Sequence, residues 1–352
     1  MEHETQNKIA LLGKTFEELK AIVSELGMPG FTAKQISEWL YKKRVFSIEA
    51  MTNISAKNRD LLSEKYEIGR TLPMQTVESE DGTKKYLFKT EGGHFIESVY
   101  IPDEDRATLC VSSQVGCKMD CKFCMTGKQG FIAQLTTTEI LNQVLSIPEA
   151  ETLTNIVFMG MGEPFDNTLP MLRSLEILTA DYGYAWSPRR ITVSSIGLIP
   201  GMKVFLEKSN CHLAISLHSP FTDERLKLMP IEKAYPIAKV LEELRKHDFS
   251  HQRRVSFEYI LFDGIKDTMR HAVELVKILR GIDCRVNLIR FHAIPGVDLK
   301  SSSAEKMTFF RDYLTNNGVT STIRRSRGED ILAACGMLST LEKEKSEKQT
   351  EA

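Results

Sequence analysis

The feature that most constrains this chain is one cluster of cysteines. Four of its seven cysteines lie between residues 110 and 124, in the stretch CVSSQVGCKMDCKFC. The last three, Cys117, Cys121 and Cys124, follow the spacing C-x3-C-x2-C. Structural zinc sites need four ligands and usually pair two C-x2-C units, and this sequence contains only one such unit. Thiolates also hold iron–sulfur clusters, and a four-iron cluster held by three cysteines leaves one iron open to a ligand.

The overall composition limits the cellular compartment and the partners that we expect for a protein with such a cluster. The chain has 352 residues, 42% of them hydrophobic, and a net charge of −1, so a nucleic-acid partner would need a local basic patch. No apolar run approaches the roughly 20 residues of a membrane span, and the N-terminus lacks a signal-peptide core. We therefore expect a cytoplasmic protein without membrane contact, whose cysteines bind metal or react rather than form a disulfide framework. Scattered, buried cysteines are the structural alternative.

Three motifs together indicate a family. The C-x3-C-x2-C motif with Phe123 before its last cysteine is similar to the motif of radical S-adenosylmethionine (SAM) enzymes. With GMGEP at 160–164 and RGEDILAACG at 327–336, the chain resembles the RNA adenosine methyltransferases of the RlmN/Cfr family, from about residue 10 to residue 338. The resemblance implies one [4Fe–4S] cluster on Cys117, Cys121 and Cys124, and two SAM molecules per turnover.

The hydrophobic pattern predicts an α/β fold. Apolar strands at 108–113, 155–160, 191–195, 213–217, 255–261 and 285–291 alternate with amphipathic helices at 138–147, 171–179, 201–208, 237–247, 269–280 and 304–316. Such alternation indicates a parallel sheet with right-handed crossovers. Six units suit the partial (βα)6 barrel of radical SAM enzymes. We expect four regions: a helical, helix-hairpin-helix-like RNA-binding accessory domain at 1–70, a short β linker at 71–103, the barrel at 104–338 and a charged, disordered tail at 339–352.

The resemblance also assigns a SAM pocket at the ends of the predicted strands. Glycines let the backbone approach a ligand closely, and Glu163 could accept a hydrogen bond from a cationic group. In the family this element holds the amino group of SAM. For single Ser or His residues, ordinary polar packing is the alternative. The residues implied are Gly162, Glu163, Ser194, Ser216, Leu217, His218 and His292, of which His292 stands where many family members carry Asn.

Two cysteines outside the triplet, with one glutamate, complete the predicted site. Cys335 lies among Ala333, Ala334 and Gly336, which leave its thiol accessible, and it matches the reactive cysteine of the family. The hypothesis is that Cys335 takes a methyl group from one SAM and a radical from a second SAM activates it for addition to adenine. Glu97 then removes the ring proton, and Cys110 attacks Cys335 to form a disulfide that releases the product.

The implied substrates are 23S rRNA at the peptidyl transferase centre and tRNA beside the anticodon, methylated at adenine carbon 2. Basic residues at the strand ends and before Cys335 are candidates for phosphate contacts: Lys118, Lys122, Lys128, Arg189, Arg190, Arg324, Arg325 and Arg327. We expect a monomer served by an electron donor such as flavodoxin. Methylation of adenine carbon 8 by the same cysteines is the nearest alternative, although the run from Gly127 to Phe131 is more similar to the carbon-2 branch. The second alternative is a non-catalytic iron–sulfur protein that carries electrons or binds RNA.

Overall fold

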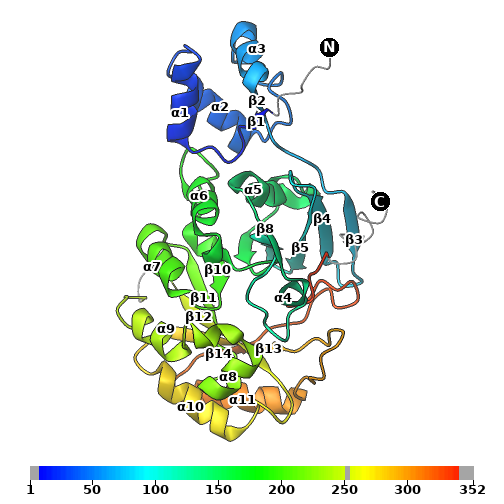
Figure 1. Cartoon of the computed structure of the whole chain (residues 1–352), viewed down its shortest axis with the longest axis vertical. Coiled ribbons are helices and arrows are strands. Elements are labelled where there is room, and N and C mark those ends of the chain that lie inside the picture. Colours follow the sequence, from blue (N-terminus) through cyan, green and yellow to red (C-terminus); the bar gives the residue numbers. More distant parts are fainter. Residues whose placement is uncertain (1–7, 250–253, 341–352) are drawn as a thin grey trace.

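The computed structural model describes residues 8–249 and 254–340 of the chain. A helical module forms one end of the molecule, and an α/β barrel with its covering helices forms the rest (Figure 1). Within the described ranges, no helix has the length and apolar character needed to cross a membrane.

The N-terminal module is built from short, well-capped helices. Thr15 and Glu18 form the capping box that starts its first helix, and Ser55 caps its third by accepting from the N–H of Asn58. Its elements are β1 (Ile9–Ala10), α1 (Phe16–Glu25), α2 (Thr32–Ser37), a π-helical turn (Glu38–Lys42), α3 (Ala56–Lys65) and β2 (Tyr66–Glu67), which pairs in parallel with β1.

The module is fixed to the barrel by specific contacts. The ring of Phe16 stacks on Tyr182 with centroids 5.5 Å apart, and the Ser37 hydroxyl donates to the Tyr182 carbonyl at 2.6 Å. Thr138, in the first barrel helix, donates to the carbonyl of Leu12 at 2.7 Å. Because these contacts involve both partly buried rings and hydrogen bonds, the module has a defined position relative to the barrel.

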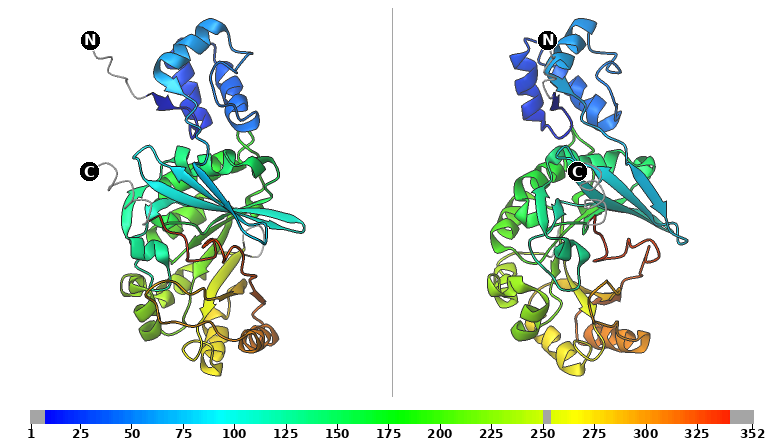
Figure 2. Two further views of the ribbon diagram at one scale, coloured as in Figure 1. Left: turned by 90° about the vertical axis from the view of Figure 1, so that its right-hand side faces the viewer. Right: turned by 45° about the vertical axis from the view of Figure 1, so that its right-hand side comes forward.

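One ten-stranded sheet forms the barrel wall and the linker together. Its order is β14-β13-β12-β11-β10-β9-β6-β5-β4-β3, parallel from β14 to β6 and antiparallel from there to β3. The sheet curves with helices on its outer side (Figure 2). The strands are β3 (Gln75–Glu78), β4 (Lys84–Lys89), β5 (Phe95–Asp103), β6 (Arg106–Cys110), β9 (Asn155–Phe158), β10 (Ile191–Ser195), β11 (His212–Ser216), β12 (Val255–Leu261), β13 (Cys284–Arg290) and β14 (Ser321–Ile323).

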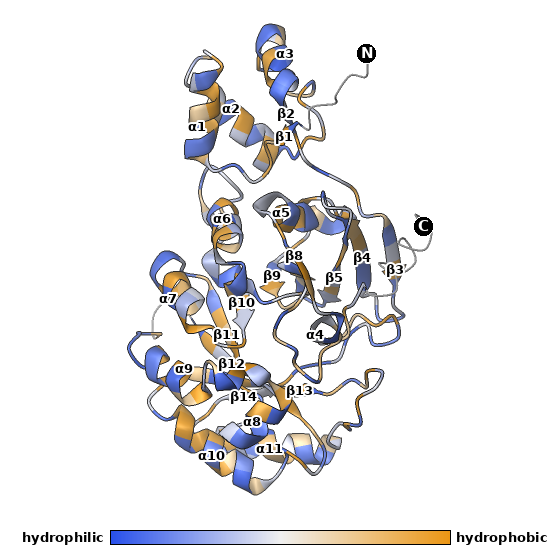
Figure 3. Ribbon diagram, in the orientation of Figure 1, coloured by the Kyte–Doolittle hydropathy of each residue, from blue (hydrophilic) through white to orange (hydrophobic). Residues whose placement is uncertain are grey.

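The helices follow the strands in alternation, and apolar strands sit beneath amphipathic helices (Figure 3). The crossover helices are α5 (Thr137–Leu145), α6 (Thr168–Thr179), α7 (Ile199–Lys208), α9 (Ile237–Leu244), α10 (Met269–Leu279) and α11 (Ala304–Asn316). Two short helices and a hairpin carry site residues: β7 (Gln114–Gly116), α4 (Met125–Gln129), β8 (Phe131–Gln134) and α8 (Thr222–Leu228).

The predicted alternation of strands and helices is confirmed, and the strands predicted at 191–195 and 255–261 match β10 and β12 end to end. The structure adds a seventh parallel strand, β14, and shows that the linker strands continue the barrel sheet. The hairpin β7–β8 escaped prediction because it is very short and encloses the cysteine loop. The tail predicted to be disordered lies outside the described residues from 341 onward, but Ser339 and Thr340 are hydrogen-bonded to the body.

Candidate active site

The three cysteines of the motif lie on one loop between β7 and α4. Cys117 directly follows β7, and Cys124 is the N-cap residue of α4. The hairpin that carries the loop is tight at Gly116, where φ is +71° and an added Cβ would lie 1.7 Å from the carbonyl oxygen of Gly130. Only glycine fits such a position. The local fold therefore gathers three thiols within one turn of chain.

The donor set fits an iron–sulfur cluster. All three thiols are free, and burial raises the pKa of Cys117 to about 12 and that of Cys121 well above its ordinary value. Without a metal, Cys117 and Cys121 are therefore protonated, and a metal centre would offset the cost of deprotonating them. Across residues 8–249 and 254–340, no three His, Cys, Asp or Glu side chains converge closely enough for a single ion. In a four-iron cluster each cysteine binds a different iron, so its ligands stand further apart than those of one zinc ion.

The predicted SAM residues lie at the carboxyl ends of neighbouring parallel strands, which meet at one edge of the sheet. Gly162 and Glu163 follow β9, Ser194 is in β10, Ser216 ends β11 with Leu217 and His218 just beyond it, and His292 follows β13. Sequence order alone separates these residues by up to 130 positions, and the parallel sheet brings their strands side by side.

Glu163 is buried at the centre of this edge, with 3% of its surface exposed. Its carboxylate accepts from the N–H groups of Phe165 and Ile196, both at 3.0 Å, which ties the end of β9 to the end of β10. Burial nevertheless raises its pKa to about 7. A carboxylate accepts more than two hydrogen bonds, so Glu163 has capacity for a cationic ligand. Gly162 beside it has φ +98°, and a Cβ there would lie 2.5 Å from Gln114.

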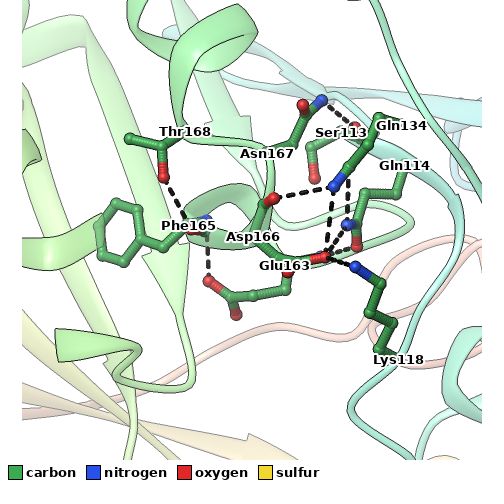
Figure 4. A network of polar contacts seen from close by, with 9 residues as sticks. All are labelled: Ser113, Gln114, Lys118, Gln134, Glu163, Phe165, Asp166, Asn167 and Thr168. Carbon is green, nitrogen blue, oxygen red and sulfur yellow. Dashed lines mark hydrogen bonds and ion pairs between the residues drawn. The ribbon is translucent and has the colours of Figure 1, made fainter. Parts of the chain in front are cut away.

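A polar network that the sequence did not reveal joins the Glu163 turn to the cysteine loop (Figure 4). The side chain of Gln114 accepts from the Glu163 N–H at 2.7 Å and donates to Asp166 at 2.7 Å. Asp166 also pairs with Lys118, the residue after Cys117, at 2.8 Å. One network thus fixes both the predicted SAM turn and the predicted cluster loop, and a lone Gln or Asp gave no signal of it.

The predicted SAM residue His218 packs against Phe123 of the cysteine motif. The His218 backbone is left-handed, with φ +55°, and its Nδ1 accepts from the N–H of Ile260 at 3.1 Å. Burial lowers the pKa of His218 well below its ordinary value, so the ring is neutral and Nε2 carries the proton. The Phe123 ring meets it edge-on, with centroids 4.8 Å apart. The aromatic residue of the cysteine motif therefore contacts a predicted SAM residue directly.

Arg225 on α8 contacts the carboxyl ends of the same strands, and it was not predicted from the sequence. Its guanidinium is fully buried and donates to the carbonyls of Leu217, Ile196 and Ser216 at 2.9 to 3.0 Å, and it pairs with Glu232. The five N–H donors of arginine match several carbonyls at once. Arg225 therefore connects the ends of β10 and β11. The sequence of its helix is typical of a charged, solvent-exposed surface, so it gave no sign of this role.

A cavity of about 150 Å³ contains the two other cysteines of the predicted site. Cys110, at the end of β6, and Cys335, in the C-terminal segment, both line it, although 225 positions separate them in the sequence. Cys124 of the predicted cluster and His292 of the predicted SAM pocket line the same space. Cys335 is exposed, as its small neighbours predicted, whereas Cys110 is buried. The cavity therefore contains a reachable thiol, a buried thiol and a cluster ligand.

Comparison with known proteins decides the family. Two family models match, the Radical SAM superfamily over residues 111–276 and the Ribosomal RNA large subunit methyltransferase N-terminal domain over residues 9–68. The "Probable dual-specificity RNA methyltransferase RlmN" of Bacteroides fragilis is 61% identical over 341 residues, covering 97% of this chain and 99% of that protein. This chain belongs to the RlmN family of radical SAM RNA methyltransferases.

More distant members of the RlmN family agree with this assignment. The "Dual-specificity RNA methyltransferase RlmN" of Syntrophus aciditrophicus is 41% identical over 95% of this chain and 97% of that protein. A crystal structure of a radical SAM methyltransferase from Sphaerobacter thermophilus matches with a TM-score of 0.88 at 39% identity, covering 94% of this chain and 99% of that one. The predicted family and α/β barrel are thereby confirmed, and membership implies a [4Fe–4S] cluster and SAM.

In this RlmN-family chain, the C-terminal segment separates the predicted base Glu97 from the cavity. Glu97 is on β5 two residues before Val99, whose cross-strand partner is Cys110, so both side chains face the same side of the sheet. Its carboxylate lies 3.0 Å from the Lys85 ammonium and accepts from the N–H of Ser339 at 3.1 Å. Leu338, the preceding residue, lines the cavity. The C-terminal segment therefore stands between Glu97 and the cavity.

Several of the basic residues proposed to contact RNA are engaged within the protein. Lys118 pairs with Asp166, Lys122 with Asp120, and Lys128 donates to the carbonyl of Pro295 at 2.6 Å. Arg325, by contrast, has 76% of its side chain exposed at the rim of the cavity. Of the arginines before Cys335, Arg325 is thus the most accessible to a phosphate, and Arg324 turns inward.

Proposed function

We propose that this protein methylates carbon 2 of an adenosine in 23S rRNA, at the peptidyl transferase centre, and in tRNA beside the anticodon. The dual specificity is suggested by the names of its relatives. The observation that carries the chemistry is the shared cavity of Cys110, Cys335 and Cys124. Methyl transfer to a heteroatom would not need two additional thiols beside a redox-active site, whereas methylation of an electron-poor carbon does.

Each thiol has a distinct role in this proposal. The [4Fe–4S] cluster, with SAM bound, supplies one-electron cleavage of a SAM C–S bond and so a 5′-deoxyadenosyl radical. Cys335 is the methyl acceptor, because it is the exposed thiol of the cavity and can attack the methyl group of a first SAM. A second SAM then activates the S-methyl group for addition to adenine. The adduct gives up its ring proton, which we assign to Glu97, and one electron, for which the oxidised cluster would be the acceptor.

Cys110 resolves the adduct. Its thiolate attacks the sulfur of Cys335, and the resulting disulfide frees the methylated RNA. The burial of Cys110 in the same cavity keeps it from competing for the methyl group while leaving it near Cys335. For Glu97 to meet the adduct, the segment at 338–339 must shift away from it.

The remaining parts of the proposal concern partners. The target adenosine enters the cavity unstacked from its neighbours, because the cavity is small and Cys110 is buried in it. Glu163 and the strand-end residues from Ser194 to His292 hold SAM, with Glu163 accepting from its amino group. The protein acts as a monomer and takes electrons from a donor of flavodoxin type.

The test combines trapping with product analysis. Holoenzyme carrying Cys110→Ala should accumulate a covalent protein–RNA adduct joined through Cys335, whereas Cys284→Ala, a thiol at the far end of β13, should turn over normally. Mass spectrometry of RNA treated with the unaltered enzyme should show 2-methyladenosine. Normal turnover by Cys110→Ala would refute the resolving role, and 8-methyladenosine as the product would refute the choice of carbon 2.

A further inference from the structure

Arg324 follows β14 and reaches into the cavity that Cys110 and Cys335 share. Its guanidinium lies 3.5 Å from the Glu258 carboxylate and 3.3 Å from the sulfur of Met159. Its backbone N–H donates to the carbonyl of Leu288 at 2.9 Å, which extends the pairing of β14 with β13. Both ends of this residue are therefore fixed, and its charge is held at the cavity wall.

Glu258 is the reason why the guanidinium stays there. It projects from β12, with only 4% of its side chain exposed. One carboxylate oxygen accepts from Asn287 at 2.7 Å and from Ser256 at 3.3 Å. The other oxygen faces Arg324 and has no hydrogen-bond partner in the part of the chain that the structure describes. A buried carboxylate without a cation is strongly destabilising, so Glu258 requires Arg324 in place.

The other side of Arg324 faces thiols. Burial and, to a lesser extent, Cys335 raise the pKa of Cys110 to about 12, even though Arg324 and the backbone N–H of Met159 act to lower it. For Arg324 itself, burial opposes the charge, but Glu258 and the two thiols outweigh burial and raise its pKa. The ionisable side chains that act on Cys110 are thus one neutral thiol and one permanent cation.

We propose that Arg324, fixed by Glu258 at the wall of the cavity that Cys110 and Cys335 share, is the positioning residue that stabilises the Cys110 thiolate when it forms. This inference rests on the resolving role of Cys110 proposed above and changes the role of Arg324 from a phosphate contact to an activator of sulfur. Cys110 first loses its thiol proton to solvent. The thiolate electron pair then forms the S–S bond, the bond from Cys335 sulfur to the RNA-bound methylene breaks, and its electron pair stays on that carbon, which takes up a proton to become the methyl group.

Alkylation of single cysteines tests this without relying on turnover. Reduced holoenzyme is treated anaerobically with iodoacetamide from pH 6.5 to 10, and peptide mass spectrometry gives a separate rate for each cysteine. Only thiolates react appreciably. Arg324→Met should slow Cys110 on the order of tenfold at pH 7.5, which corresponds to a shift of about one pH unit in its rate profile. Arg324→Lys should recover most of the rate, because it keeps the positive charge.

Matched variants separate this role from a structural one. Arg325→Met removes an exposed arginine from the rim of the same cavity and should leave Cys110 within about twofold of its rate. Glu258→Gln keeps an oxygen near Arg324 but removes the competing charge, so Cys110 should react faster. Cys211, buried beside β11, reports folding, since it reacts only if the protein opens.

Two results would overturn the inference. One is an unchanged Cys110 profile in Arg324→Met with Cys211 still protected. The other is an equal slowing in Arg324→Met and Glu258→Gln with no recovery of the rate in Arg324→Lys, which would make the pair purely structural. If Arg324→Met exposes Cys211, the other two variants decide: Cys110 should keep most of its alkylation rate in Arg324→Lys and should react faster in Glu258→Gln. Failure of the resolving role would appear instead as normal turnover by Cys110→Ala, whatever the alkylation rates.

Discussion

Glu163→Gln should change how the stability of this protein depends on pH. The carboxylate is buried and has a pKa of about 7 instead of 4.5, so the folded state holds its proton more tightly than the unfolded state does. Stability from this group is therefore complete below pH 4.5 and is lost as the pH rises through 7. The difference of about 2.5 pH units corresponds to about 3 kcal/mol. Glutamine, which is neutral at every pH, does not lose this contribution.

Thermal unfolding of anaerobic holoenzyme measures the effect. For a chain of this length, about 3 kcal/mol shifts the midpoint by about 4 °C. The midpoint of Glu163→Gln relative to the unaltered protein should rise by most of that amount between pH 5 and pH 8. Lost hydrogen bonds to Phe165 or Ile196 would add a constant offset, which this comparison cancels. A difference between the two proteins that stays constant with pH would refute the reasoning.

The pH dependence of SAM binding provides a second test of Glu163→Gln. A ligand ammonium beside Glu163 favours the carboxylate, so it should bind more tightly once the pH exceeds about 7. The stabilisation of the unaltered protein by SAM should therefore grow from pH 5 to pH 8, and that of Glu163→Gln should not. Equal growth in both proteins would place the amino group of SAM elsewhere in the pocket.

Three further outcomes are expected. Gly162→Ala should lower the free energy of unfolding by about 2–4 kcal/mol, since its Cβ would lie 2.5 Å from a neighbouring side chain, whereas Gly264→Ala, with a similar positive φ but open space, should cost only about 1 kcal/mol in the same denaturation assay. Arg225→Met should cost about 3–5 kcal/mol by leaving a buried carboxylate unpaired, and adding Glu232→Gln should recover part of it; no recovery would contradict the pairing. Removing iron with a chelator should increase amide hydrogen exchange in residues 335–340 more than in α10, and equal increases would show general loosening instead.

Periodicity predicted what depends on repeating local patterns. Strands carry a local signal in their β-branched, aromatic and apolar residues, so β10 and β12 could be located to the residue. The antiparallel strands β3 to β5 were expected as a separate linker, because nothing local shows that β5 pairs with β6 in the barrel sheet. The same limit applies to β14: the sequence shows a β-like run before Arg324, but it does not show that this run pairs with β13 in the barrel sheet.

The site divides along the same line. Cysteines with characteristic spacing could be found because their residue type carries the chemistry. Arg225 and Glu258 could not, since a charged residue in a helix or strand reads as a solvated surface until the fold shows it buried. Arg324 was predicted as a phosphate contact, because a run of arginines suggests one, and its pairing with buried Glu258 could not be seen in the sequence.

The helix α4 links the predicted cluster loop to Cys335. It begins at Cys124, and its first N–H, from Met125, donates to the carbonyl of Gly336 at 2.7 Å. Thr126 then donates to the carbonyl of Leu338 at 2.7 Å. Any ligand that fixes Cys124 therefore also fixes the backbone on the C-terminal side of Cys335, and the thiol keeps its place relative to that ligand. The same hydrogen bonds hold Leu338 and Ser339 beside Glu97. Freeing the proposed base therefore requires these bonds to break. Release of Glu97 and movement of Cys335 are then coupled.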